Sequence, residues 1–178
     1  MNKINIYWLI TNHISSLKDE GSTTLSKQDL WLHFFFPALA SALVCFFCKV
    51  MPASVVGIMV NFGSITTALL MSAVVMVYDQ KSKIIEKKER ENVQDKITTY
   101  TKNISLYKEL CQNICFAILT SIIIVILSAI LSFYDLKITS GFGYYFFLAC
   151  SFFCYAFFIS TMITFLMILK RFSIVLDN

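Results

Sequence analysis

The chain has 178 residues, of which 57% are hydrophobic and 15% charged, and its formal net charge is +4. Soluble domains carry about 25% charged residues, so this chain has too few to cover a water-exposed surface. Its apolar residues gather in four blocks, each long enough for the roughly 20 helical residues that cross a bilayer. The composition therefore excludes a soluble globular domain and predicts an all-α membrane protein with four transmembrane helices.

Residues 1–28 form a polar N-terminal arm. Apolar and aromatic residues recur along one side of a short helix within this arm, namely Ile4, Tyr7, Trp8, Ile14 and Leu17. Tyrosine and tryptophan rings favour the headgroup level of a membrane. We therefore predict that the arm holds a helix that lies in the membrane interface.

Residues 29–178 are predicted to form one transmembrane domain, with spans at about 29–48, 55–78, 111–134 and 142–169. Pro37 lies inside the first span, where it removes a backbone hydrogen bond and predicts a kink. The segment from Asp135 to Gly141 is predicted to be a short turn. Lys170 and Arg171 are predicted to end the fourth helix.

The polar segment 79–110 separates the second span from the third. Its run from Lys81 to Glu91 places Lys and Glu at helical spacings, which favours a helix. We therefore predict that the second span continues beyond the bilayer as a charged stalk. A second, short helix is predicted from about Asn103, leading into the third span.

Thirteen of the fifteen Lys and Arg residues lie in the arm, in the 79–110 segment and in the C-terminal tail. The two short connections hold one each, Lys49 and Lys137. Positively charged residues are retained on the cytoplasmic side of a membrane. The distribution therefore predicts that the stalk and both termini are cytoplasmic.

Small and polar residues form stripes along three of the predicted spans. The second span carries Gly57, Asn61, Ser64, Ala68 and Met71/Ser72, with Gly63 and Thr67 beside them; the third carries Asn113, Ala117, Thr120/Ser121, Ser128 and Ser132; the fourth carries Cys150, Cys154, Thr161 and Thr164. Such stripes either let helices pack closely or line an aqueous path in an oligomer. The second interpretation makes the pore-lining candidates Gly57, Asn61, Ser64, Thr67, Ala68 and Asn113.

The predicted stalk offers a second candidate site. Its basic residues could bind an anionic ligand or a protein partner, and the candidates are Lys81, Lys83, Lys87, Lys88 and Arg90. Alternatively, these residues only solvate the stalk. The interleaved glutamates weaken the positive field and argue against binding of free nucleic acid.

The sequence provides little evidence for an enzyme, a cofactor or a metal site. It contains no nucleotide-binding, hydrolase or metalloprotease motif, and no carboxylate falls in mid-membrane, which argues against a proton-coupled exporter. His33, one turn into the first span, is interpreted as an interfacial histidine, with pH sensing as the alternative. The six cysteines are expected to pack as small apolar residues rather than to bind zinc.

Cys45 and Cys48 form a C-x-x-C motif near the predicted outer face. Four helices with this motif resemble the quinone-linked disulfide-generating enzymes of the bacterial inner membrane. That family keeps a second cysteine pair in its other outer loop, whereas the connection 135–141 contains none here. The pair here also lies inside a predicted helix, so we interpret the chain as a non-enzyme.

The layout resembles the small four-helix membrane effectors of bacterial anti-phage systems, the Hailong effector among them. The similarity covers about residues 29–172, and the segments that carry it are Phe34–Ala38 after an acidic helix entry, Tyr78–Asp79, Tyr107–Leu110 with Asn113, and Leu166–Arg171. The resemblance implies a homo-oligomeric ion channel in the bacterial inner membrane that depolarises the membrane during abortive infection. It also implies a cytoplasmic sensor or a nucleotide or oligonucleotide signal as partner.

The leading hypothesis is therefore a channel effector gated from the cytoplasm, with the second span lining the path. The alternative is a membrane anchor that recruits a cytoplasmic partner through residues 79–110.

Overall fold

The structure is a computed structural model that describes residues 6–15, 31–134 and 140–176. Within these ranges four helical segments are long and apolar enough to cross a membrane: Trp31–Cys48, Ala53–Arg90, Gln94–Leu131 and Phe142–Ile174. The prediction of an all-helical fold is confirmed for the described residues, and these four helices support a multi-pass membrane protein. The basic residues Lys3, Lys18, Lys27 and Lys137 and most of the predicted turn 135–141 lie outside the described residues.

The first span consists of η1 (Trp31–Phe35), a turn of π-helix, followed by α3 (Phe36–Cys48). Pro37 lies in the first turn of α3. Because proline has no amide hydrogen, the regular hydrogen-bond ladder is interrupted at this point. The irregularity that the sequence predicts here takes the form of this wider turn, which precedes the proline.

The second and third spans form a long hairpin of α4 (Ala53–Arg90) and α5 (Gln94–Leu131), each of 38 residues. The predicted extension of the second span is confirmed, because α4 continues to Arg90. The prediction of a separate helix from Asn103 is wrong, since α5 is continuous from Gln94. Half-buried side chains recur on α5 every three or four residues, at Ile97, Tyr100, Ile104 and Tyr107. This seam continues the packing of α5 beyond the apolar part of the helix.

The fourth helix, α6 (Phe142–Leu176), extends beyond its predicted end. Lys170 and Arg171 do not stop it, because both residues are good helix formers. Arg171 is instead half-buried, and its Nη1 lies 3.1 Å from Oε2 of Glu109 on α5. The third helix ends slightly early, at Leu131 rather than at residue 134.

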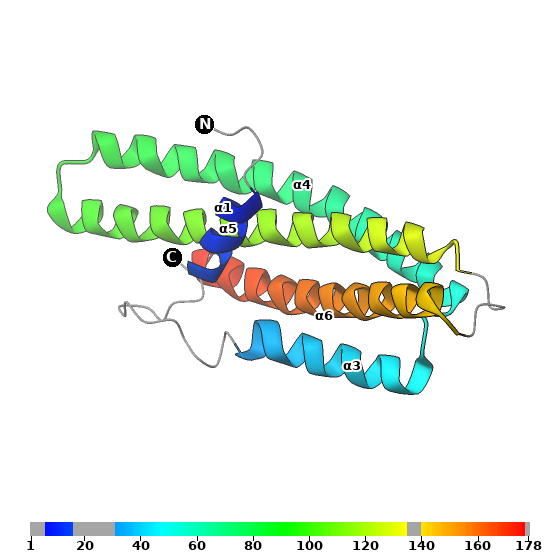
Figure 1. Cartoon of the computed structure of the whole chain (residues 1–178). Coiled ribbons are helices and arrows are strands. Elements are labelled where there is room, and N and C mark those ends of the chain that lie inside the picture. Colours follow the sequence, from blue (N-terminus) through cyan, green and yellow to red (C-terminus); the bar gives the residue numbers. More distant parts are fainter. Residues whose placement is uncertain (1–5, 16–30, 135–139, 177–178) are drawn as a thin grey trace.

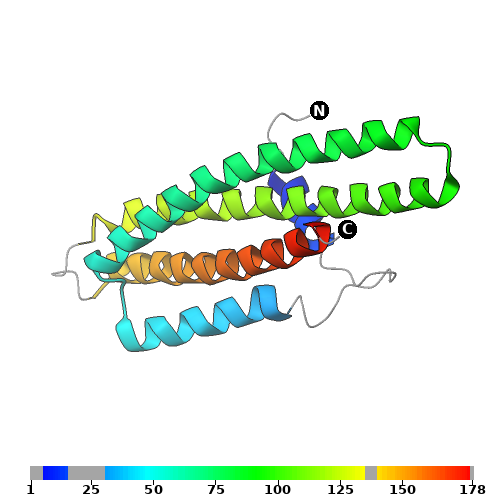
Figure 2. The same ribbon diagram turned by 180° about the vertical axis from the view of Figure 1, so that it is seen from behind.

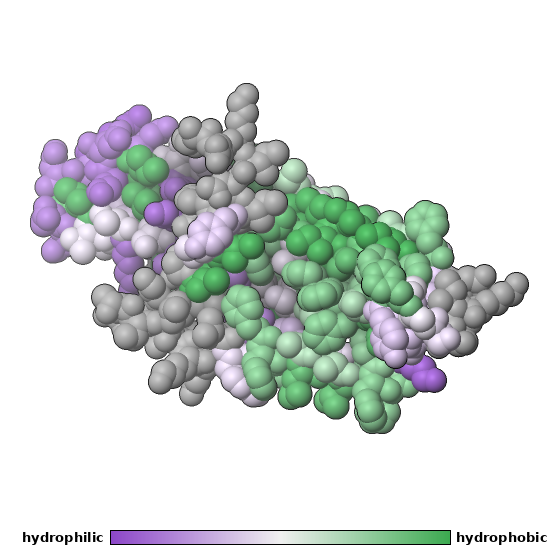
Figure 3. All heavy atoms as spheres, viewed as in Figure 1, coloured by the Kyte–Doolittle hydropathy of each residue, from purple (hydrophilic) through white to green (hydrophobic). Residues whose placement is uncertain are grey.

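The spans lie side by side, with α6 between α3 and the α4–α5 hairpin (Figures 1 and 2). Half of the most apolar window of α5 is buried, compared with 17% for the first span and for α4. The core therefore lies along α5. Figure 3 shows hydrophilic residues over the projecting end of the hairpin and apolar residues over the spans. Residues 79–110 form this projecting stalk, and the end of the spans from which it extends is called the stalk end below.

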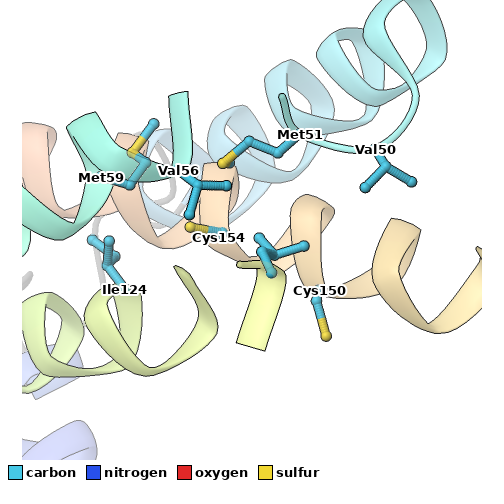
Figure 4. Close-up of a cluster of buried hydrophobic side chains, with 8 residues drawn as sticks. Val50, Met51, Val56, Met59, Ile124, Cys150 and Cys154 are labelled. Carbon is cyan, nitrogen blue, oxygen red and sulfur yellow. The ribbon is translucent and has the colours of Figure 1, made fainter. Parts of the chain in front are cut away.

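Two hydrophobic clusters hold the helices together. The first lies at the end opposite the stalk and combines the α3–α4 connection with α4, α5 and α6, through Val50, Met51, Val56, Met59, Ile124, Leu131, Cys150 and Cys154 (Figure 4). The Met51 amide also donates to the Ser151 hydroxyl, at 3.0 Å. The second cluster lies toward the stalk and includes Leu70, Val77, Leu110, Ile114, Ala117 and Ile168.

The N-terminal helix α1 (Ile6–Ser15) confirms that the arm contains a short helix. In Figures 1 and 2 it crosses α5 near the C-terminal end of α6, and its principal contacts are with α5. One side of α1 is exposed, including Tyr7 and Thr11, while His13 on the other side is buried.

Candidate functional site

The polar stripe of the second span lies on the face of α4 that is turned away from α5. All residues of this stripe are exposed, Met71 and Ser72 included, and the four that were predicted to line a pore are called the outer face of α4 below: Gly57, Asn61, Ser64 and Ala68. The opposite face carries the buried residues of the helix, Val56, Met59, Gly63, Thr66, Leu70 and Val77. The structure thus brings four of the six predicted pore-lining residues together on one exposed helical face.

The two glycines of α4 distinguish the packed face from the outer face. A Cβ atom on Gly63 would lie 2.7 Å from Val125 Cγ2 and 2.9 Å from the carbonyl oxygen of Ser121. Gly63 is therefore needed for the close approach of α4 and α5. A Cβ on Gly57 would meet nothing within 4 Å, so packing within one copy of the chain does not explain this glycine.

Asn61 is the most polar residue of the outer face. It lies eight residues after the start of α4, about 12 Å along the helix axis at a rise of 1.5 Å per residue. That depth is inside a hydrocarbon layer of about 30 Å. Among the residues that the structure describes, none forms a hydrogen bond with the Asn61 side chain. An amide that faced lipid at that depth would be costly.

Thr67 and Asn113, the other predicted pore-lining residues, are placed differently. Thr67 is half-buried, and its hydroxyl donates to the Gly63 carbonyl at 2.7 Å, so its polarity is satisfied within the helix. Asn113 is fully buried on α5, and its Oδ1 lies 2.9 Å from His13 Nδ1 of α1. The structure therefore does not bring Asn113 to the outer face of α4.

The stripes of the third and fourth spans lie mainly in helix interfaces. The Thr161 hydroxyl donates to that of Thr120 at 2.8 Å, and Ser128 Oγ lies 3.5 Å from Cys154 Sγ. All four side chains are buried. Close packing thus accounts for these stripes, whereas the outer face of α4 is left exposed by the part of the chain that the structure describes.

The stalk divides the predicted binding residues between two environments. Lys83, Lys87 and Arg90 are exposed, while Lys81 and Lys88 are half-buried. The Lys83 ammonium also lies 2.7 Å from an Asp79 carboxylate oxygen. The exposed surface is therefore smaller than the predicted set and is partly neutralised.

Glu91 ends α4 and shapes the turn of the stalk. Its carboxylate accepts the backbone amides of Asn92 and Val93, each at 3.2 Å. The Val93 hydrogen bond and the nearby Lys96 ammonium lower the pKa of Glu91. This side chain thereby supplies the acceptor for two backbone amides in the turn between α4 and α5.

The structure also gathers polar residues that sequence reasoning did not connect. At the stalk end, His13 of α1 stacks on Phe116 of α5 and contacts His33 of η1, beside the Arg171–Glu109 ion pair. These residues, with Asn113, form the His13 cluster. His13 and Asn113 are 100 residues apart, so no sequence spacing could reveal the contact. The helical pattern of the arm gave no signal for it either, because Tyr7 of the predicted apolar side is exposed and His13 lies on the other side of α1.

The cysteines are free thiols distributed over three helices. Cys45 and Cys48 lie in the last turn of α3, inside the helix as predicted. Within the described ranges, no three His, Cys, Asp or Glu side chains are placed to hold a metal ion.

Comparisons of the chain with protein-family models, curated proteins and solved structures find no match.

Proposed function

We propose that the protein is the subunit of a homo-oligomeric membrane channel whose path is lined by the outer face of α4. The observation that carries the proposal is Asn61, an exposed amide within a candidate span, on a helix face that no described helix covers. Several copies arranged around an axis would turn these amides toward one another and toward water. Lipid would then contact the apolar surfaces of α3 and α6.

The two glycines support an assembly through this face. Small residues let helices in a membrane approach closely, and Gly57 has space beside it that a neighbouring helix could fill. Gly63, by contrast, already serves the α4–α5 contact. A second copy of the chain would thus approach the outer face of α4 closely at Gly57, as α5 approaches the opposite face at Gly63.

The stalk is the proposed input. We place it in the cytoplasm together with both termini, on the strength of the distribution of basic residues. Because α4 is continuous from Ala53 to Arg90, a displacement at the stalk tip is transmitted along the same helix that lines the path. Lys83, Lys87 and Arg90 are the exposed residues that an anionic ligand or an acidic partner would meet.

The proposed biological role is that of a bacterial anti-phage effector in the inner membrane. It rests on the resemblance of the sequence layout, over about residues 29–172, to that of such effectors. Opening the path would depolarise an infected cell and stop phage propagation. The signal would be a nucleotide, an oligonucleotide or a sensor protein in the cytoplasm.

The test measures ion flux from liposomes that contain the purified protein, together with the membrane potential of cells that express it. Asn61→Leu should reduce the flux at least tenfold, because an apolar ring would then close the path. Asn61→Gln retains the amide and should conduct, and Ser132→Ala, an exposed hydroxyl at the end of α5, serves as the matched control.

Two outcomes would refute parts of the proposal. A wild-type protein without ion flux under any activating condition would exclude a channel. Undiminished flux through Asn61→Leu would instead show that the path runs elsewhere.

A membrane anchor that recruits a cytoplasmic partner is the second candidate, favoured by the exposed basic residues of the stalk. Reversing the charges of Lys83, Lys87 and Arg90 to Glu should then abolish co-purification of the partner and leave the membrane potential unchanged. Depolarisation by the unmodified chain alone would exclude a function limited to anchoring.

A further inference from the structure

The helix α1 is attached to the rest of the molecule through a deeply buried histidine. His13 is 1% exposed, although it belongs to a short helix on the surface. Its Nδ1 lies 2.9 Å from Asn113 Oδ1, and its ring stacks on Phe116 with a centroid distance of 3.8 Å and an interplanar angle of 5°. Both contacts are with α5, so His13 fixes the position of α1 on the central helix.

The same histidine also contacts the entry of the first span. The rings of His13 and His33 meet edge to face, with centroids 5.6 Å apart. His33 is itself buried and belongs to the π-helical turn η1 that precedes Pro37. His13 therefore links three elements: α1 on the surface, α5 in the core and the start of α3.

The charges around His13 favour its neutral form. Arg171 on α6 and His33 on η1 both oppose a positive charge on the ring, and Glu109 on α5 is engaged with Arg171. The Asn113 side chain partly counteracts them by accepting a hydrogen bond. With burial as the largest contribution, these groups lower the pKa of His13 from its ordinary value of 6.5 to about 4.

The helix itself has little stability apart from this docking. It has 10 residues, fewer than the roughly 12–15 that an isolated helix needs to be even marginally stable in water. Elements with few buried contacts open locally far more often than the core does. Loss of the His13 contacts should therefore release α1 without unfolding the spans.

We infer that α1 is a releasable clasp: its docking on α5 through His13 holds His33 and thereby fixes the entry of α3, and its release frees that entry. The clasp is a switch element at the stalk end of the molecule. It is separate from the outer face of α4, and its test requires no ion flux.

Hydrogen–deuterium exchange of the full chain in lipid nanodiscs at pH 7.5 tests the clasp. In the wild-type protein, the amides of residues 6–15 and 31–35 should be protected. His13→Ala should lower protection of residues 6–15 at least tenfold and lower that of 31–35 as well. His13→Gln should retain part of the protection at both segments, because the glutamine amide can still form a hydrogen bond with Asn113. Tyr7→Ala, on the exposed side of α1, is the matched control and should change neither.

Two results would overturn the inference. Unchanged protection of residues 6–15 in His13→Ala would show that the histidine does not hold α1. Loss of protection in 6–15 with 31–35 unchanged would show that α1 is docked but not coupled to α3. Protection of the α5 amides at 114–131 reports whether the variant retains its spans.

If the His13→Ala variant also loses protection of the α5 amides, the inference is tested on the wild-type protein by changing the pH. A histidine with a pKa of about 4 when docked and 6.5 when released takes up a proton on release. Lowering the pH from 7.5 to 5.5 should therefore make release of α1 about tenfold more frequent, after correction for intrinsic exchange rates. Residues 31–35 should follow, and protection that is independent of pH at both segments would overturn the inference.

Discussion

Gly63 and Gly57 permit a crossed experiment on the two faces of α4. At Gly63, an added Cβ would lie 2.9 Å from the Ser121 carbonyl oxygen, a backbone atom that cannot move unless α5 shifts. Overpacking of this kind costs about 1–3 kcal/mol, against a gain of up to about 1 kcal/mol in helix propensity. Gly63→Ala should therefore lower the free energy of unfolding by about 1–2 kcal/mol.

At Gly57 the same change has the opposite effect on a single copy of the chain. An added Cβ meets open space, so only the gain in helix propensity remains, again up to about 1 kcal/mol. In an assembly through the outer face of α4, however, a large side chain would separate the helices. Gly57→Leu should therefore dissociate the oligomer while leaving the fold of each subunit intact.

The two effects are measured separately. Thermal unfolding in detergent reports the stability of the subunit, and native mass spectrometry reports the number of chains in the particle. Gly57→Ala and Gly63→Ala form the matched pair for stability. A particle whose size is unchanged by Gly57→Leu would refute the assignment of this face to subunit contact. A Gly63→Ala protein as stable as the wild type would refute the close α4–α5 approach.

Three further predictions concern contacts within one subunit. A double-mutant cycle between Thr161→Val and Thr120→Val should give a coupling energy of about 0.6 kcal/mol in denaturant unfolding, typical of hydrogen bonds between membrane helices; a value of zero would contradict the 2.8 Å contact. Arg171→Glu should destabilise the protein by about 1 kcal/mol, and the added change Glu109→Arg should recover much of the loss, whereas no recovery would contradict the ion pair. Folding lowers the pKa of His13 from 6.5 to about 4, because the folded protein holds the ring neutral. The contribution of His13 to the free energy of unfolding is therefore complete above about pH 6.5 and falls by a total of about 3 kcal/mol as the pH is lowered toward 4. His13→Gln should remove this part of the pH dependence of the melting temperature.

The positions of the spans were predictable because each is a long apolar block, and the start of the stalk because Lys and Glu recur at helical spacing after Tyr78. The ends of the helices were less predictable. Lys170 and Arg171 mark a change from apolar to polar residues, yet a helix can continue through such a change when a partner is available, as Glu109 is for Arg171. Likewise, α5 begins early because its polar part has a neighbouring helix to pack against.

The candidate site was predictable in part for a physical reason. Helical periodicity shows which residues share a face, so Gly57, Asn61, Ser64 and Ala68 could be grouped from their spacing. It does not show which face meets a neighbouring helix. Asn113 therefore resembled a pore-lining residue in the sequence, although it is buried against His13 of α1. Contacts between such distant segments depend on the packing of whole helices.

The length of α4 determines how far the stalk tip extends from the membrane into the aqueous phase. Its 38 residues extend about 57 Å, nearly twice the hydrocarbon thickness of about 30 Å. If α4 enters the hydrocarbon layer at Ala53, the tip near Arg90 would stand clear of the lipid headgroups on the other side. A partner that binds the tip would need no affinity for the membrane. A tilt of α4 by a few degrees about its membrane-embedded half would displace the tip several times further than it displaces the embedded residues.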